Sequence, residues 1–407
     1  MKPILLLVFM FTSRVALADG ALTWSQLPAL PDAFGFGGPA VGTSGNALIV
    51  AGGANFPNGP PWRRGDSPAG TKVWHDRIFA IEPNAMQWVE AGNLPRPLAY
   101  TAAVSTPEGI YLLGGETYNG SQQPSADVLR LNWNADTKRV TIVENALPPL
   151  PVPSRYHQAA VLGRVIYVTA SSARGTDSQQ LDVKSFWSLD LDRPPGQRRW
   201  QVREAWPGRP REKMSVAVQH AGLGEGGAIS PCFYLFSGEN WFKDADGELD
   251  PTRYELFADA YRYNPARDKW TRIADLPAVP DALEPSNPRP PSNLLHASEL
   301  VAAPRPAVAA TAIGVGRSHV LIFSGANGRS FHLPLEQRPL FPRELLDYHT
   351  VTNTWSVAGL MPMGVVTTSA VRWNGQIVIP SGEIRPGIRT NRVHSLSLPA
   401  THIFAAE

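Results

Sequence analysis

Six short apolar runs, each ending in or followed by a pair of small residues, constrain the fold of this chain more than any other feature. The runs are ALIVAGG at 47–53, GIYLLGG at 109–115, VIYVTAS at 165–171, FYLFSG at 233–238, HVLIFSG at 319–325 and QIVIPSG at 376–382. Each reads as a buried β-strand with a turn signal at its end. Recurrence of this kind indicates a repeat architecture in which every unit contributes the same strands.

Three further strands accompany each run in a constant order. A strand of small residues precedes it, as in TAAVST at 101–106, and a third strand follows, as in DRIFAIEP from Asp76. In most units a fourth strand carries a tryptophan and continues into Leu-Pro, as in KWTRIADLP around Trp270. Four strands per unit with a glycine pair and a tryptophan are typical of a kelch-type β-propeller blade. We expect the first strand of each unit to line a central channel.

The sixth unit lacks a fourth strand of its own. It ends in NRVHSLSLPATHIF with no tryptophan strand behind it, whereas TWSQLPALP at 23–31 matches the missing pattern through Trp24. Pairing these two segments removes two open sheet edges at once. The sequence therefore predicts an all-β, six-bladed kelch-type β-propeller whose last blade is closed by the N-terminal strand.

The first eighteen residues have the pattern of a secretory signal peptide. Lys2 precedes an apolar run at 4–11, and Ala16 and Ala18 form a small-x-small cleavage site. The apolar run is too short for a membrane span. We expect residues 1–18 to be a signal peptide and residues 19–407 to form a single propeller domain, periplasmic or secreted and free of the membrane after cleavage.

The charge balance argues against two classes of partner. The chain has 37 basic and 35 acidic residues, and residues 1–18 contain Lys2 and Arg14 but no acid, which leaves 35 of each. A balanced charge gives no electrostatic reason to expect nucleic acid or an anionic membrane as partner. Cys232 is alone, so no intramolecular disulfide is possible. The histidines are scattered singly, and we expect no metal or other cofactor.

The segment GEIRPGIRT at 382–390 places a carboxylate and a guanidinium just past a strand end. Glu383 follows the predicted strand at 376–381, and Arg389 lies at the other end of the loop. Pro386 and Gly387 favour a turn that brings the two side chains to one mouth. Spacing alone leaves two interpretations open, an acid/base group beside an anion clamp or a loop salt bridge without chemistry.

This segment resembles the catalytic loop of the kelch-type N-acetylneuraminate epimerases, the sialic acid mutarotases. GGANFPNGPPW at 52–62 and LLGGETYNG at 112–120 are similar to other loops of that family. The catalytic loop of the usual members lies in a middle blade, whereas here it lies in the last, an order similar to the cyclically permuted branch. The resemblance implies an isomerase that acts on N-acetylneuraminate or a related small acidic sugar, with Glu383 and Arg389 in catalysis and substrate binding.

Mutarotation opens and recloses a cyclic hemiketal, which suits the two residue types. A carboxylate such as Glu383 can take the anomeric hydroxyl proton, and a planar guanidinium such as Arg389 can hold the substrate carboxylate. Glu116 and Glu239 follow small-residue pairs as Glu383 does, so all three are expected at one end of the channel. Glu116, Glu239 and Asn55 of blade one either bind sugar hydroxyls or satisfy a turn. Arg155 and Arg305 precede first strands, where Arg96 and Arg211 recur, and they either brace the blade entries or belong to a ring of positive charge that gathers an acidic sugar.

Other functions remain open on the sequence alone. A non-catalytic kelch module that binds glycans or protein is favoured if Glu383 and Arg389 pair only with each other. A glycosidase of the sialidase kind would need a further acid or nucleophile that the sequence does not single out. A copper oxidase would need a Tyr/His set that is not evident. The oligomeric state is not predicted.

Overall fold

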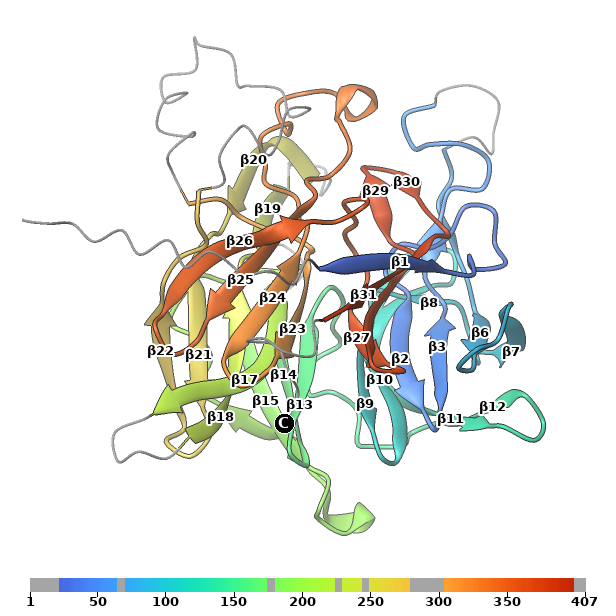
Figure 1. The fold of residues 1–407 in the computed structure, drawn as a ribbon, viewed down its shortest axis with the longest axis horizontal. Coiled ribbons are helices and arrows are strands. Elements are labelled where there is room, and N and C mark those ends of the chain that lie inside the picture. The colour runs from blue at the N-terminus through green and yellow to red at the C-terminus, as the bar shows by residue number, and fades with distance from the viewer. Residues whose placement is uncertain are drawn as a thin grey trace, which may run out of the picture.

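The computed structural model describes residues 22–63, 70–173, 180–223, 229–243, 249–278 and 304–398. These residues form six antiparallel sheets around a common axis (Figure 1). Two short 3₁₀-helices, Pro195–Gln197 and Leu335–Gln337, also lie within these ranges. Within the described ranges no helix is long and apolar enough to cross a membrane. The expected signal peptide at 1–18 lies outside the described residues.

Each sheet contains the four strands that the sequence pattern predicts, ordered from the channel outwards. Blades one and two consist of β2 (Ala40–Ser44), β3 (Ala47–Ala51), β6 (Arg77–Ile81) and β7 (Val89–Asn93), then β9 (Ala102–Thr106), β10 (Gly109–Tyr118), β11 (Gln122–Asn134) and β12 (Arg139–Val143). Blades three and four consist of β13 (Gln158–Leu162), β14 (Val165–Ser172), β15 (Val183–Asp190) and β16 (Gln201–Arg203), then β17 (Ser215–Leu223), β18 (Ile229–Phe236), β21 (Ala260–Asn264) and β22 (Lys269–Ile273).

Blade five consists of β23 (Thr311–Val315), β24 (His319–Phe323), β25 (Glu344–His349) and β26 (Thr354–Leu360). Blade six consists of β27 (Val371–Trp373), β28 (Gln376–Pro380), β31 (Val393–Ser397) and β1 (Thr23–Leu27). The N-terminal β1 pairs antiparallel with β31, from Thr23 opposite Ser397 to Leu27 opposite Val393. The predicted closure of the last blade is therefore confirmed.

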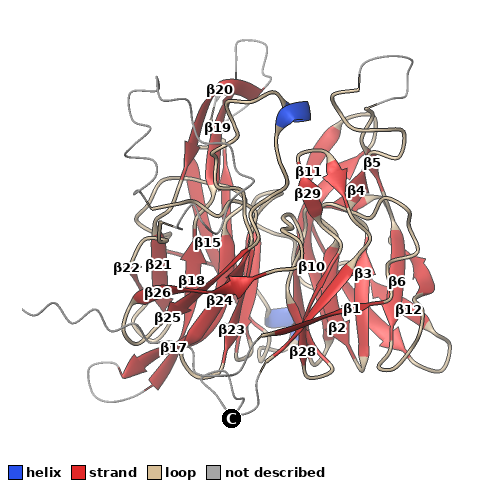
Figure 2. Ribbon diagram, turned by 45° about the horizontal axis from the view of Figure 1, so that its top comes forward, coloured by secondary structure: helices blue, strands red, loops and turns tan. Residues whose placement is uncertain are grey.

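Short excursions from the blades gather at one end of the propeller. They are the pairs β4 (Ala54–Asn55) with β5 (Val73–Trp74), β19 (Glu239–Lys243) with β20 (Leu249–Leu256) and β29 (Glu383–Arg385) with β30 (Ile388–Arg389), while β8 (Leu98–Ala99) pairs with the end of β10. Figure 2 shows all three pairs on the same side of the blades. This end therefore carries the predicted loop GEIRPGIRT together with chain from blades one and four.

The hydrophobic core is divided into clusters between neighbouring blades. One cluster, for example, packs Leu345 of blade five against Ile379 of blade six, with Trp24 of β1 at its edge. Four of the fourth-strand tryptophans add a hydrogen bond between blades, because the indole N–H of each donates to a backbone carbonyl at the end of the preceding fourth strand. The pairs are Trp88 to Pro28, Trp200 to Pro148, Trp270 to Glu204 and Trp355 to Ala274, at 2.8–3.0 Å. Tryptophan therefore recurs because it fills an interface and ties two blades together.

The small-residue pairs turn the chain at this end of the blades. Ser381 and Gly382 have φ of 60° and 107°. A φ of 107° is costly for any residue with a Cβ, so position 382 favours glycine. The Gly382 N–H then donates to Phe36 O at 2.9 Å, which fixes the start of the Glu383 loop. Blade three, whose corresponding residues continue in β14, has no such pair of positive φ values.

Candidate functional site

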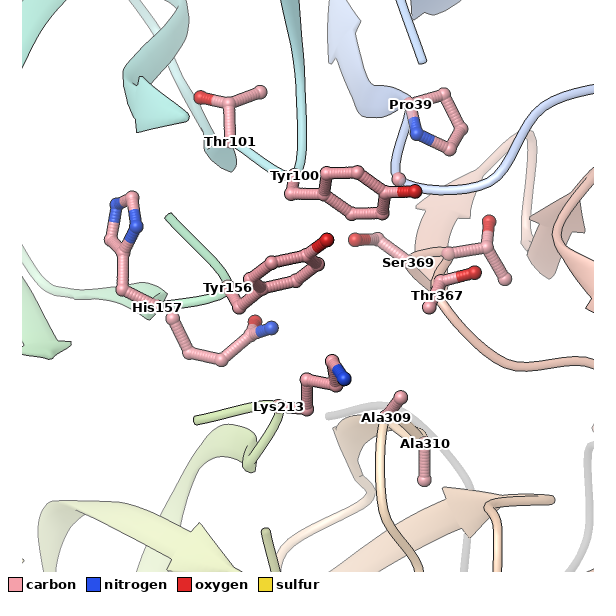
Figure 3. Close-up of a pocket in the computed structure, with 13 residues that line it drawn as sticks. Pro39, Tyr100, Thr101, Tyr156, His157, Lys213, Ala309, Ala310, Thr367 and Ser369 are labelled. Atoms are coloured by element: carbon pink, nitrogen blue, oxygen red, sulfur yellow. The ribbon is translucent and has the colours of Figure 1, made fainter. Parts of the chain in front are cut away.

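A closed ring of backbone hydrogen bonds surrounds one mouth of the channel. One residue from each blade contributes its N–H to the carbonyl of the preceding blade, with N···O distances of 2.7–3.2 Å. We call these six residues the collar: Gly38, Tyr100, Tyr156, Lys213, Ala309 and Thr367. All six have positive φ, between 53° and 65°. Figure 3 shows Tyr100, Tyr156, Lys213 and Thr367 grouped around the axis.

The channel and a cavity lie on the two sides of the collar. The predicted first strands, β2, β9, β13, β17, β23 and β27, line the channel, which has a volume of about 440 Å³. Beyond the collar, under the excursions, lies a cavity of about 300 Å³. Its charged lining residues are Lys72, Lys213, Glu239, Arg338, Glu383 and Arg389. This volume is at the lower end of the range for small-molecule sites.

Glu383 and Arg389 face each other in this cavity. The segment GEIRPGIRT forms the hairpin β29–β30, in which Glu383 is the cross-strand partner of Arg389. Arg389 Nη1 lies 3.4 Å from Glu383 Oε1, and the Gly387 N–H donates to the same oxygen at 2.6 Å. The turn needs glycine at 387, because φ is 81° and a Cβ would lie 2.3 Å from Pro61 Cδ. The expectation that this loop brings the two side chains together is confirmed.

The Arg389 guanidinium is buried but not saturated with hydrogen bonds. Its side chain is 5% exposed and stacks on Phe56, with Cζ 4.6 Å from the ring centroid. Burial lowers its pKa, yet the Glu383 carboxylate and then Tyr100 raise it, and the net direction is upward. Neither Nε nor Nη1 has a hydrogen-bond acceptor among the described residues. A buried cation with unused donors is suited to an anionic ligand.

Glu239 lines the same cavity and pairs with a collar residue. Its Oε1 lies 2.5 Å from Lys213 Nζ, and Glu212 approaches the same ammonium at 3.5 Å. Burial lowers the pKa of Lys213, but Glu239 and Glu212 together raise it above its ordinary value. Burial also raises the pKa of Glu212. Lys213 is therefore a permanent cation at the cavity floor.

Glu116 lies beneath the cavity as an internal counter-ion and is fully buried. It accepts hydrogen bonds from Trp74 Nε1 at 3.0 Å and Lys72 Nζ at 3.3 Å, and it forms an ion pair with Arg155. Its carboxylate thus orients two cations, of which Lys72 lines the cavity. Glu116, Glu239 and Glu383 do lie at one end of the channel, as their positions in the repeat predict.

Asn55 and the other arginines are placed differently. Asn55 donates to Gly35 O at 2.9 Å and pairs through Oδ1 with His75 Nε2 at 2.8 Å, so its amide holds a loop. It borders a separate pocket of about 120 Å³ that shares Phe56 and Arg389 with the main cavity. Arg305 is buried and is not among the residues that line either space. Arg211 is buried against Asp259, and Arg96 also forms an ion pair, with Asp127.

Sequence reasoning missed the collar side chains as site residues. Tyr100, Tyr156 and Lys213 each lie two positions before the first strand of their blade. That constant offset, repeated at Gly38 and Ala309, is a signal that could have found them. Arg338 and Lys72 lie in long connections, where no repeat marks their positions.

An aromatic wall closes one side of the cavity. Trp241 of β19 stacks on Phe331 with ring centroids 5.7 Å apart. Arg338 packs over Phe331 at 4.9 Å and donates to the carbonyls of Phe331 and Leu333. No carboxylate in the described ranges forms an ion pair with Arg338, so the lining carries four cations against two carboxylates. The cavity is positively charged on balance.

No metal centre competes with this cavity in the part of the chain that the structure describes. Groups of three or more His, Cys, Asp or Glu side chains able to hold a metal ion are absent there. Cys232 is buried in the core between blades four and five, and burial raises the pKa of its thiol to about 11.

Comparison with known proteins finds a family similar to the first third of the chain. The family model described as N-acetylneuraminate epimerase matches residues 10–142. This part of the chain is similar to the N-acetylneuraminate epimerases. The matched residues cover blades one and two and do not include the hairpin β29–β30.

Relatives of the epimerase family match different lengths of the chain. An N-acetylneuraminate epimerase of Haemophilus influenzae is 28% identical over 264 residues, which cover 61% of this chain and 58% of the relative. Those of Brucella suis and Yersinia pestis are 34% and 38% identical over 132 and 118 residues, or 32% and 28% of the relatives. The chain thus spans less than two thirds of the length of these relatives. The solved structure of YjhT covers 92% of this chain and 98% of its own, with a TM-score of 0.57 and 16% identity, which supports the fold.

Proposed function

We propose that this chain is a mutarotase that interconverts the anomers of N-acetylneuraminate or a related acidic sugar. The observation that carries the proposal is the Arg389 guanidinium, buried beside Glu383 in the cavity with Nε and Nη1 lacking hydrogen bonds to described residues. The activity named for the relatives agrees with this site.

Arg389 and Glu383 have different roles in the opening of the sugar ring. The sugar carboxylate takes the place of Glu383 as the anionic partner of the Arg389 guanidinium, whose planar fork fits a carboxylate. Glu383 is then free to take the proton of the anomeric hydroxyl. General acid/base catalysis of this kind accelerates a reaction by about 10² to 10⁴ fold. The net positive charge of the lining, from Lys72, Lys213 and Arg338, favours an acidic sugar over a neutral one.

The test is an anomer-exchange measurement by NMR that starts from a single, freshly released anomer. We expect the initial rate with N-acetylneuraminate to exceed the uncatalysed rate, while the final anomer ratio stays unchanged, because a catalyst does not shift an equilibrium. A neutral ketose without the carboxylate serves as the matched control and should show no acceleration. Binding of the acidic sugar without any acceleration would favour a non-catalytic glycan-binding module instead.

We also propose that the protein acts in the periplasm or is secreted. The charged start, apolar run and small-x-small site within residues 1–18 support this. The intact mass of exported protein tests it, and a mature chain that starts at Asp19 is the expected result. Retention of Met1 in a membrane fraction would contradict export.

We further propose that the order of blades is cyclically permuted relative to the usual family members. The candidate catalytic hairpin belongs to the last blade, whereas the family model matches only residues 10–142. Superposing blade six on the catalytic-loop blade of a relative tests this, since a permuted chain should align over more residues when its sequence order is rotated.

A further inference from the structure

We propose that Tyr156 is the group that protonates the ring oxygen of the sugar when the ring opens. The inference rests on the proposed function and completes it. As the bond to the ring oxygen breaks, negative charge develops on that oxygen and must be neutralised by a proton. Glu383 removes a proton elsewhere and cannot supply this one, so a second group is required. It must be protonated, face the cavity and tolerate the loss of its proton.

The collar holds Tyr156 at the centre of the site. Its φ of 53° is unusual for a bulky side chain, and such strained residues cluster at functional sites. The conformation is maintained because its N–H donates to Tyr100 O at 3.2 Å and its carbonyl accepts from Lys213 N at 3.0 Å. The ring lines both the pocket inside the collar and the larger cavity (Figure 3). Tyr156 belongs to blade three and Glu383 to blade six, so they lie on opposite sides of the axis.

The hydroxyl of Tyr156 is available for transfer. It makes no hydrogen bond to any residue that the structure describes, and the Tyr156 side chain lines the cavity. Burial of the side chain is the largest of the influences that raise its pKa well above 10, so the hydroxyl keeps its proton at neutral pH. The charged and titratable groups around it are Tyr100, Glu116, Glu212, Arg155 and Lys213.

Two cations prepare the site for the phenolate that would form. Lys213 Nζ lies 5.0 Å and Arg155 Cζ 5.7 Å from the centroid of the Tyr156 ring. Opposite charges at this range stabilise the deprotonated form once it appears. Both cations are held in place by carboxylates, Lys213 by Glu239 and Arg155 by Glu116.

The neighbouring groups suit this role less well. The ammonium of Lys213 is bound by Glu239 and Glu212, which hold its protons. Tyr100 is 8% exposed, and Lys72 Nζ lies 4.4 Å from the centroid of its ring. Tyr100 also interacts with the Arg389 guanidinium and raises its pKa. Tyr100 therefore adjoins the carboxylate-binding part of the cavity.

The proton transfers balance over the reaction. Glu383 takes the proton of the anomeric hydroxyl, and the released electron pair forms the carbonyl bond. The bond between the anomeric carbon and the ring oxygen breaks, its electron pair stays on that oxygen, and the oxygen takes the proton of Tyr156. Reclosure on the other face of the carbonyl reverses both transfers. The neutral phenol and the Glu383 carboxylate are restored, and no other reactant is consumed.

The experiment compares Tyr156→Phe with wild type in the anomer-exchange assay. We expect the initial rate to fall by about 10² fold with sugar binding retained, because only the acid is removed. Tyr118→Phe is the matched control, since Tyr118 is 47% exposed on the β10–β11 hairpin. An unchanged rate in Tyr156→Phe would overturn the inference.

A second variant separates proton donation from a structural role. A difluorinated tyrosine at 156 keeps the shape but makes the phenol more acidic, so we expect its rate to fall at a lower pH than that of wild type. A pH profile identical to wild type would also overturn the inference. The two proposals fail distinguishably, because wild type without acceleration rejects the mutarotase itself, whereas acceleration that survives Tyr156→Phe rejects only the role of Tyr156.

Discussion

Arg389 Nη1 lies 3.4 Å from Glu383 Oε1 across the hairpin β29–β30, and both groups face the cavity. At this distance Glu383 balances the charge of Arg389 without saturating the guanidinium, since Nε and Nη1 lack hydrogen bonds to described residues. An incoming carboxylate can therefore bind Arg389 and release Glu383. The two residues should respond differently to substitution.

Glu383→Gln tests the base. The amide keeps the shape and can still accept the Gly387 N–H, but it cannot take a proton. We expect the initial rate of anomer exchange to fall by about 10² fold or more, while binding of N-acetylneuraminate changes little. NMR exchange and calorimetric titration measure the two quantities. Equal activity of the variant and wild type would refute the catalytic assignment.

Arg389→Lys tests the anion clamp. Lysine keeps the charge but loses the planar fork and the stacking on Phe56. We expect weaker binding to dominate, by about 1.5 to 3 kcal/mol if one charge-assisted hydrogen bond is lost. Titration with the sugar measures this loss. A variant with wild-type affinity would show that Arg389 does not hold the substrate.

Gly37→Ala should displace the Arg389 guanidinium. A Cβ at position 37 would lie 3.0 Å from Arg389 Nε and 3.4 Å from Nη2, so the guanidinium must shift by a few tenths of an ångström. Misplacement of a positioning group lowers the rate of a reaction that depends on orientation, and we expect a loss of about 10 fold or more. Gly196→Ala is the control, because a Cβ there meets no atom within 4 Å. Equal rates for both variants would count against a tightly positioned guanidinium.

The sequence predicted the repeating strands and the hairpin more fully than the cavity. Each blade is specified locally by an apolar run and a small-residue pair, most blades also by a tryptophan, and the missing tryptophan strand identified Trp24 as the closing element. The proximity of Glu383 and Arg389 could be predicted from the sequence because both residues lie on one short hairpin.

The remaining site residues come together only when the six blades close into the propeller. Lys72 and Tyr156 belong to blades one and three, and neither has a local signal for a common cavity. For Asn55, the position in the sequence suggested substrate binding, whereas the structure shows its amide hydrogen-bonded to Gly35 and His75. Such partners depend on loop paths that strand periodicity does not determine.

Deletion of residues 22–31 should destabilise the whole propeller. It removes β1, exposes the edge of β31, takes Trp24 from the core and removes the Pro28 acceptor of Trp88. We expect a loss of several kcal/mol, since truncating a packed tryptophan alone costs about 3 to 5 kcal/mol. Thermal and urea unfolding measure it. Met86→Ala, at a side chain 86% exposed, is the control for a surface change, and a deletion variant that melts as wild type does would contradict closure by β1.

His157 should make the fold sensitive to acid. It is buried beside the collar, and burial lowers its pKa from 6.5 to about 4, against a smaller opposite effect of the Leu113 backbone. Above pH 6.5, the pKa of the histidine in the unfolded chain, His157 is neutral in both the folded and the unfolded state and does not affect the pH dependence of stability. As the pH falls from about 6.5 to about 4, the unfolded chain takes up a proton that the folded state does not, so the free energy of unfolding decreases.

His157→Leu should remove this part of the acid sensitivity. The change from about pH 7 to about pH 5 costs wild type about 2 kcal/mol through this one group, and the variant should not show that loss. Urea unfolding of both proteins at the two pH values measures the difference, in which the contributions of all other groups cancel. The absolute stability of the variant can differ from that of wild type, but the pH-dependent difference cannot be produced by packing alone. If both proteins lose the same free energy on acidification, His157 is not protonated on unfolding in this range and the assigned burial effect is wrong.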